Sequence, residues 1–403
     1  MKYLVLVCDG AADYPIESLG GKTPLEAADK PCMDKLAKKS LCGTVLNVPK
    51  GMVPESDTAN LAILSYDPKV FSKGRSPLEA MSMGLHMNPN DTAYRCNLVT
   101  LSEEDCDYDE RTMLDHSADE ITTAEADELI KALEAHFGRD GLHFYTGVSY
   151  RHCMILENGI ERYEFARPHD ILTRKIADYL PKDKDGRFFY DIMRESYDIL
   201  ENHPINVSRR ERGLRPANSA WFWSPGRKPA LPSFKEKWGI DASVISAVDL
   251  IKGIGICAGM ESIDVEGATG NYNTNYKGKA DAAIDAFERG KSLVYLHVEG
   301  PDECGHRAEL DNKILAIERI DHEILAPVFE YLASSGDDFK ILVLPDHPTP
   351  VSLRTHSPEP VCFMLYSSAS EHEGVDKYCE KECGKCALYI PDGYKLLDIM
   401  IEK

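Results

Sequence analysis

Several features are missing or scarce in this chain of 403 residues, and each absence narrows its function. No apolar run approaches the roughly 20 residues that cross a bilayer, and Met1 leads straight into a strand-like segment, which leaves no room for a signal peptide. Basic residues are outnumbered by acidic ones, 46 to 67, giving a formal net charge of −21. Because this charge repels nucleic acids and anionic membranes, we expect neither as a partner. The missing secretory signal predicts a cytoplasmic protein.

Cysteines are not scarce, but the chain lacks the secretory signal that would indicate disulfide bonds between them. The chain has 12, and without a secretory signal we expect reduced thiols. The tightest group is Cys379-x3-Cys383-x2-Cys386, for which no fourth zinc ligand is obvious nearby. We interpret these cysteines as structural residues of a surface loop, with a zinc site as the alternative.

The two ends of the chain alternate between strand and helix patterns, whereas the middle has a different texture. Buried strands are predicted at 3–7, 244–248, 292–298 and 340–344, and helices at 279–289 and 311–334. From about residue 91, an alternating strand is followed by acidic loops, a helix and short strands. The length favours two domains. We predict a discontinuous α/β domain, 1–90 with 243–403, interrupted by an inserted α+β cap, 91–242.

Three of the predicted strands are each followed by Asp or His. Asp9 follows 3–7, whereas Asp302 and His306 follow 292–298. The run 340–344 leads to Asp346-His347, with His356 a little further on. Since ligands collect at the carboxyl ends of an open α/β sheet, this pattern predicts a metal site. Taken singly, Asp9 could be a turn residue and His306 a surface histidine.

The chemistry of these residues indicates which ions the site would take. Carboxylates and imidazoles without a thiolate suit Mn²⁺ or Zn²⁺ better than Ca²⁺. Six such residues exceed the need of one tetrahedral ion, so two ions about 4–5 Å apart would use them.

Ser56 is the candidate nucleophile. It lies in Pro54-Glu-Ser-Asp-Thr, at the start of a predicted helix, and the sequence has no Gly-x-Ser-x-Gly motif to pair it with a histidine base. Metal coordination would lower the pKa of its hydroxyl, and the helix N-terminus would attract a phosphoryl group. The alternative is that Ser56 only caps its helix.

Together these motifs resemble the archaeal-type 2,3-bisphosphoglycerate-independent phosphoglycerate mutases of the alkaline phosphatase superfamily. The similar stretches are Asp9-Gly, Pro54-x-Ser-Asp-Thr-Ala-Asn, Arg75-Ser-Pro-Leu-Glu-Ala, Gly147-Val-Ser-Tyr-Arg-His, Gly267-Ala-Thr-Gly, Pro301-Asp-Glu-x-Gly-His and Asp346-His-x-Thr-Pro. The resemblance implies an alkaline-phosphatase-like open sheet with helices on both faces, interrupted by the cap.

The resemblance also implies a glycolytic isomerase that interconverts 3-phosphoglycerate and 2-phosphoglycerate through a phosphoserine at Ser56. One divalent ion would be held by Asp9, Ser56, Asp346 and His347, and a second by Asp302, His306 and His356. Mn²⁺ is the favoured metal, with Zn²⁺, Co²⁺ and Mg²⁺ as alternatives. The small phosphorylated anion would be bound by Arg151, His152, Arg227 and Lys252, for which surface or ion-pairing roles are the alternatives.

Two other functions remain open at this level, and so does the oligomeric state. Bacterial relatives of this mutase group have been proposed as homoserine kinases, and the acidic stretch around Glu103, Glu104, Asp105 and Asp107 could favour a cationic acceptor. A metal-dependent phosphohydrolase is the other alternative. The sulfatase pattern x-Pro-x-Arg is absent after Ser56.

Overall fold

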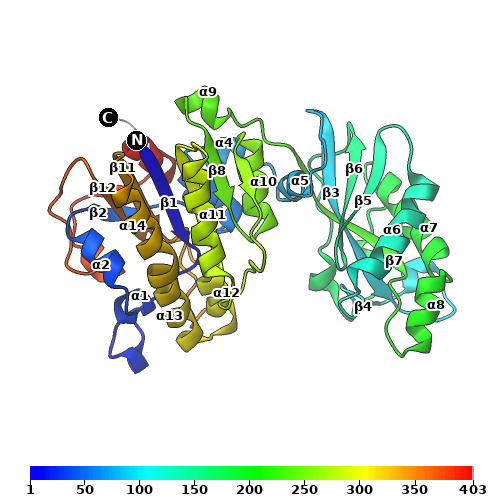
Figure 1. Ribbon diagram of the computed structural model, residues 1–403. Helices are drawn as coiled ribbons and strands as arrows, with labels where there is room; N and C mark the ends of the chain where they lie inside the picture. Colours follow the sequence, from blue (N-terminus) through cyan, green and yellow to red (C-terminus); the bar gives the residue numbers. More distant parts are fainter. Residues whose placement is uncertain (402–403) are drawn as a thin grey trace. The chain divides into compact units, whose positions relative to one another are not determined.

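A computed structural model describes residues 1–401, which form two compact units. Unit 1 is Met1–Ser72 with Ala230–Lys403, and unit 2 is Lys73–Pro229 (Figure 1). The segments 73–90 and 230–242 thus belong to units 2 and 1, respectively. The domain limits inferred from sequence, 91 and 242, stay a prediction.

Unit 1 is built on an eight-stranded sheet in the order β13-β2-β12-β11-β1-β10-β8-β9. Its strands are β1 (Lys2–Cys8), β2 (Leu41–Val45), β8 (Ala242–Ile245), β9 (Glu261–Ile263), β10 (Leu293–Val298), β11 (Phe339–Leu344), β12 (Val361–Ser367) and β13 (Tyr389–Ile390). β12 alone runs against the others. In the centre, Val5 pairs with Tyr295 on one side and Leu342 on the other, and all three are fully buried. Strands buried on both faces read as continuous apolar runs, which is why they were predictable.

Helices cover both faces of this sheet, as predicted for an α/β fold. Leu4 and Leu6 of β1 share a core with Ala283 of α11 (Tyr276–Glu288) and Val328 of α14 (Ala326–Ser334). Figure 1 shows α11, α14 and α13 (Leu310–Arg319) together over that face. On the other face, Tyr295 of β10 reaches α3 (Ser56–Ile63). The remaining α-helices of unit 1 are α1 (Pro24–Ala27), α2 (Pro31–Ala37), α4 (Pro68–Phe71), α9 (Phe234–Trp238), α10 (Asp249–Cys257), α12 (Gly300–Arg307), α15 (Glu380–Cys383) and α16 (Leu396–Ile401).

The helix predicted at 311–334 is not one continuous α-helix. A π-helical segment, η5 (Ile320–Leu325), separates α13 from α14. Pro327 lies in the first turn of α14. Proline has no N–H to donate to the preceding turn, so the regular α-helical hydrogen bond is missing at this point. The isoleucine spacing that predicted the helix continues across this break and does not reveal it.

Unit 2 has an antiparallel sheet with helices packed against it. Its strands are β3 (Asp91–Leu101), β4 (Met113–Asp115), β5 (Leu142–Val148), β6 (Arg151–Glu157) and β7 (Ser219–Arg227). The order is β4-β3-β6-β5, and β7 also pairs with β3. The helices are α5 (Ser76–Ser82), α6 (Thr123–Phe137), α7 (Arg187–Leu200) and α8 (Pro204–Glu211). Leu129 of α6, Met193 of α7 and Phe222 of β7 belong to one core.

Two further expectations concern membranes and cysteines. No helix within residues 1–401 is both long and apolar enough to cross a membrane. All 12 cysteines are free thiols. The expected surface loop is wrong for Cys379 and Cys383, which are buried because α15 packs into the core of unit 1. Within residues 1–401, the groups of side chains close enough to share an ion do not include the cysteine cluster.

Candidate active site

Three adjacent parallel strands of unit 1 end at one edge of the sheet, and candidate ligands follow each. Asp9 follows β1, Asp346 and His347 follow β11, and Asp302 lies on α12 just after β10. Since the carboxyl ends of parallel strands meet, these side chains gather there. Gly10 permits the close approach, because a Cβ at this position would lie 2.6 Å from Asp302 Cα.

Asp9, Asp346 and His297 form a first cluster, in which one candidate ligand atom of each lies within 4.8 Å of the others. The His297 Nε2 atom is 3.0 Å from Asp9 Oδ2. Asp346 Oδ1 accepts a hydrogen bond from the Gly10 amide at 3.1 Å. Asp9 Oδ1 is buried and has no hydrogen-bond partner in the described chain, so it is free to bind a ligand.

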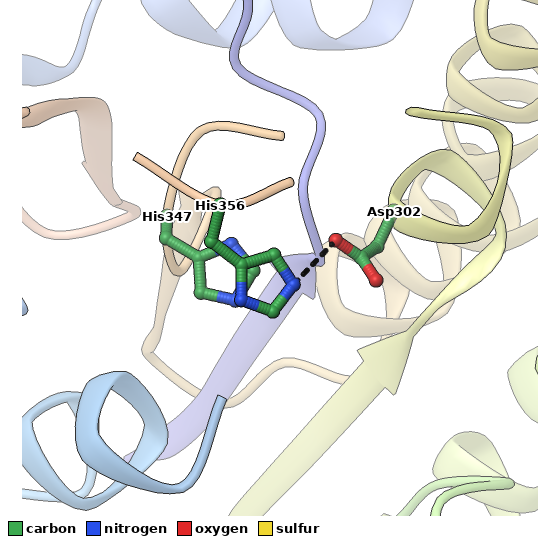
Figure 2. A group of neighbouring side chains, drawn as sticks. All are labelled: Asp302, His347 and His356. Atoms are coloured by element: carbon green, nitrogen blue, oxygen red, sulfur yellow. Dashed lines mark ion pairs between the residues drawn. The ribbon is translucent and has the colours of Figure 1, made fainter. Parts of the chain in front are cut away.

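Asp302, His347 and His356 form a second cluster beside the first (Figure 2). The His347 and His356 rings stack with their centroids 3.9 Å apart. Asp302 Oδ1 is 3.3 Å from His356 Nε2, and Asp302 Oδ2 is 3.2 Å from His306 Nε2. His347 Nε2 also lies 3.4 Å from Asp346 Oδ2, so this histidine stands between the two clusters.

Ser56 is the first residue of α3, and its Oγ atom is 3.3 Å from His347 Nε2. Asn60, one turn later, donates to the Ser56 carbonyl at 2.8 Å and to Asp346 Oδ2 at 3.0 Å. The Tyr295 hydroxyl in turn donates to Asn60 Oδ1. The preceding residue, Glu55, makes no side-chain cap hydrogen bond, which leaves the helix N-terminus available to an anion.

Two acids at this edge, Asp9 and Glu299, have too little positive charge around them. Burial, then Asp346 and Asp302, raises the pKa of Asp9 well above its ordinary value. Burial, then Asp302 and Glu303, raises the pKa of Glu299 to about 8. Burial lowers the pKa of His297 to about 4, so this imidazole is neutral. Divalent cations would supply the missing charge, and the oxygen and imidazole donors fit them.

Comparisons with known proteins agree with this geometry. A family model for 2,3-bisphosphoglycerate-independent phosphoglycerate mutase matches residues 37–206. A curated protein of that name from Methanosarcina barkeri is 44% identical over 404 residues, covering 100% of both chains. This chain belongs to that mutase family. A probable mutase of the same name from Geobacter sulfurreducens is 45% identical, also over 100% of both chains.

Two solved structures match nearly the whole length of this chain. A cofactor-independent phosphoglycerate mutase from Thermoplasma acidophilum has a TM-score of 0.70 and 26% identity, covering 100% of this chain and 99% of the other. A Pyrococcus horikoshii protein has a TM-score of 0.82 and 28% identity, covering 99% and 96%. The resemblance to the 2,3-bisphosphoglycerate-independent phosphoglycerate mutases is therefore confirmed.

The basic residues expected to bind substrate are divided between the two units. Lys252 lies on α10 of unit 1, where its Nζ atom is 2.6 Å from Asp264 Oδ1. Arg151 begins β6 and Arg227 ends β7, both in unit 2. Arg151 pairs with Asn97 of β3 and Arg227 with Thr92, so the two arginines lie at separate positions along that strand. Their substrate role stays a prediction.

The environments of the three candidates in unit 2 differ. Arg151 is exposed, with its guanidinium 5.7 Å from the Tyr150 ring. Arg227 donates to the Gly159 carbonyl at 3.3 Å. His152 is 4% exposed, and burial lowers its pKa to about 3, so its imidazole is neutral at pH 7.

Sequence reasoning missed four residues of the site: Tyr295, His297, Glu299 and Asn60. Tyr295 and His297 alternate along β10 and so point to one face of the strand, and Glu299 is the N-cap of α12 directly after it. Three polar side chains with a period of two in an apolar run are a usable signal. Asn60 lies one turn after Ser56 on α3, which makes it a predictable neighbour of the nucleophile.

Proposed function

We propose that this chain interconverts 3-phosphoglycerate and 2-phosphoglycerate, and that Ser56 carries the phosphoryl group between the two positions. The family named above supports the reaction. The placement of Ser56 supports the carrier: it begins α3, and its Oγ atom lies 3.3 Å from His347 in a cluster of buried acids and imidazoles. A serine that only capped its helix would need no such neighbours.

The candidate ligands would hold two divalent ions, with Mn²⁺ the favoured metal over Zn²⁺, Co²⁺ and Mg²⁺. One ion would be bound by Asp9, Ser56, Asp346 and His347, and the other by Asp302, His306 and His356. When bound, such ions lower the pKa of a serine hydroxyl and neutralise the charge of the phosphoryl group.

The phosphoryl transfer takes place in two steps, and bonds and protons balance in each. Ser56 Oγ gives up its proton and forms a bond to phosphorus, while the bond from phosphorus to the C3 oxygen of glycerate breaks and that oxygen gains a proton. The C2 hydroxyl then loses its proton and its oxygen forms a bond to phosphorus, while the bond from phosphorus to Ser56 Oγ breaks and that oxygen regains a proton. Asn60 keeps the start of α3 fixed relative to Asp346 in both steps.

Glycerate must stay bound between the two transfers, and this separates a mutase from a hydrolase. We assign this retention to Arg151, His152, Arg227 and Lys252. Arginine suits phosphate and carboxylate because of its two-pronged geometry. In His152, Nδ1 accepts from the Gly147 amide at 3.1 Å, so the neutral ring carries its proton on Nε2. Nε2 has no partner in the described chain and could donate to a substrate oxygen.

The decisive test combines turnover with detection of the intermediate. Purified protein with Mn²⁺ should convert 3-phosphoglycerate to 2-phosphoglycerate in a ³¹P NMR assay, and mass spectrometry should find phosphate on Ser56. Ser56→Ala should abolish both, whereas Ser40→Ala, a buried serine that bonds to Leu36 at the end of α2, should abolish neither.

Two outcomes would count against the proposal. Turnover that persists in Ser56→Ala would make water or another group the phosphoryl acceptor. Inactivity on 3-phosphoglycerate, together with phosphorylation of homoserine by ATP, would replace the mutase with the kinase.

A further inference from the structure

Lys313 of α13 is buried without any exposed surface, and its ammonium group bonds to two loops that lead away from the candidate ligands. The Nζ atom lies 2.7 Å from Asp13 Oδ2 and donates to the Thr349 carbonyl at 2.8 Å. It is also 3.4 Å from the Ala12 carbonyl. We propose that Lys313 is a positioning residue that holds the metal centre in its binding geometry.

The two loops follow β1 and β11, the strands that deliver Asp9 and the pair Asp346-His347. Asp13 Oδ2 accepts from Lys313 and also from the Val351 amide at 3.1 Å. The Thr349 amide donates back to the Ala12 carbonyl at 3.2 Å. Lys313 therefore lies at the junction of both loops, and its three N–H groups match the three oxygens around it.

The junction continues directly to the second cluster. The Thr349 hydroxyl donates to Asp302 Oδ1 and lies 3.3 Å from His347 Nδ1. Gly305 of α12 lies so close to the Thr349 backbone that a Cβ there would be 2.4 Å from the Thr349 carbonyl oxygen. Lys313 thus fixes the residue that orients Asp302, although it contacts no candidate ligand itself.

A purely electrostatic role for Lys313 predicts the opposite result from a positioning role. Its positive charge lies close enough to Asp302 for their charges to interact. By Coulomb's law, removing that charge would strengthen the binding of a divalent cation. If Lys313 positions the ligands, its removal weakens cation binding, because the loops lose their common anchor. The direction of the change therefore distinguishes the two roles.

The experiment compares four forms of the full chain and rests on the proposed metal centre. The forms are the natural protein, Lys313→Met, the double variant Lys313→Met with Asp13→Asn, and Lys30→Met. The double variant keeps the site neutral, because a buried Asp13 without its partner could prevent folding. Lys30→Met is the matched control, since Lys30 is equally buried and ion-paired, 2.6 Å from Asp34 on α2.

Mn²⁺ affinity is measured by isothermal titration calorimetry, and ligand geometry by the visible absorption of bound Co²⁺. We expect both Lys313 variants to bind Mn²⁺ about ten- to a hundredfold more weakly and to alter the Co²⁺ spectrum, as is typical when a residue behind the ligands is lost. Lys30→Met should lose thermal stability but keep the affinity and the spectrum of the natural protein.

Unchanged or tighter Mn²⁺ binding in the folded Lys313 variants would overturn the inference. So would an equal loss of affinity in Lys30→Met. If the natural protein itself bound no Mn²⁺, Zn²⁺ or Co²⁺, the proposed metal centre would fail instead, and this outcome is distinguishable from the other two.

Discussion

Polar residues at strand ends are arranged differently in the two units. In unit 1, β11, β1 and β10 are parallel neighbours, so Asp346, Asp9 and Asp302 meet at one edge. In unit 2, every strand pair is antiparallel, so neighbouring strands end at opposite edges. Arg151 begins β6 and Arg227 ends β7, and both strands run antiparallel to β3, so the two arginines lie at separate positions along it. A residue's place directly after a strand therefore predicts a shared site far better in a parallel sheet than in an antiparallel one.

If unit 1 holds the ions, the largest loss of bound metal should come from replacing Asp302, which lies within 3.3 Å of both His306 and His356. Asp302→Ala should lower bound metal from two ions per chain to one, as counted by plasma mass spectrometry. Turnover should fall by at least about a thousandfold, because the loss of one ion removes charge stabilisation worth several kcal/mol.

The control for this variant is Asp285→Asn on α11, whose carboxylate forms an exposed ion pair with Arg289. It should keep both ions and full turnover. Two retained ions in Asp302→Ala would show that the cluster around His356 binds metal without this carboxylate.

If unit 2 binds the substrate, Arg151→Met should weaken catalysis without changing metal content. A hydrogen bond to a charged group is worth about 2 kcal/mol, so kcat/KM should fall about thirtyfold. Stability should change by no more than about 0.5 kcal/mol, since Arg151 is exposed. Steady-state kinetics and metal analysis on the same preparation would show whether the units divide these tasks.

Arg187→Met is the matched control, because Arg187 is exposed and pairs with Asp191 within its own helix. It should leave kcat/KM unchanged. A drop in metal content in Arg151→Met would contradict the division between the units.

A further prediction concerns stability and pH in unit 2. His152 has a folded pKa of about 3 against an ordinary value of 6.5, because burial disfavours its charged form. Below pH 6.5 the unfolded chain therefore binds a proton that the folded chain refuses. The neutral His152 contributes fully to the free energy of unfolding above pH 6.5. This contribution falls by up to about 1.4 kcal/mol per pH unit as the pH drops toward 3.

Urea unfolding of the natural protein and His152→Gln between pH 7 and pH 4.5 would measure this term. Glutamine can still accept from the Gly147 amide, so the variant should fold and lose stability less steeply with acid. Parallel curves for the two proteins would mean that His152 is protonated in the folded state.

The sequence was sufficient for the strands that carry the site and for the α/β class. β1, β10 and β11 are buried on both faces, so each appears as an apolar run with Asp or His directly after it. The same reasoning located Ser56 at the start of a helix, where the structure has it. These features depend on local pattern and on the general geometry of parallel sheets.

Other features leave no mark on the hydrophobic pattern and were not predicted. Lys313 looks like an ordinary residue of an amphipathic helix until the loops at Asp13 and Thr349 are seen around its ammonium group. The π turn before Pro327 interrupts a periodicity that the sequence carries straight through. Cys383 looked like a loop residue because α15 is only one turn long, yet it lies in the core.

The central place of β1 has a consequence for how the chain is made. This strand pairs with β10 and β11, so Val5 cannot form its pairs until Tyr295 and Leu342 have been synthesised. All residues of unit 2, by contrast, have been synthesised once the chain reaches Pro229. On the ribosome, a seven-residue apolar segment therefore stays without either neighbour while most of the protein is synthesised. Exposed strands of this kind are prone to aggregate, so we expect β1 to need protection by chaperones until its partner strands are made.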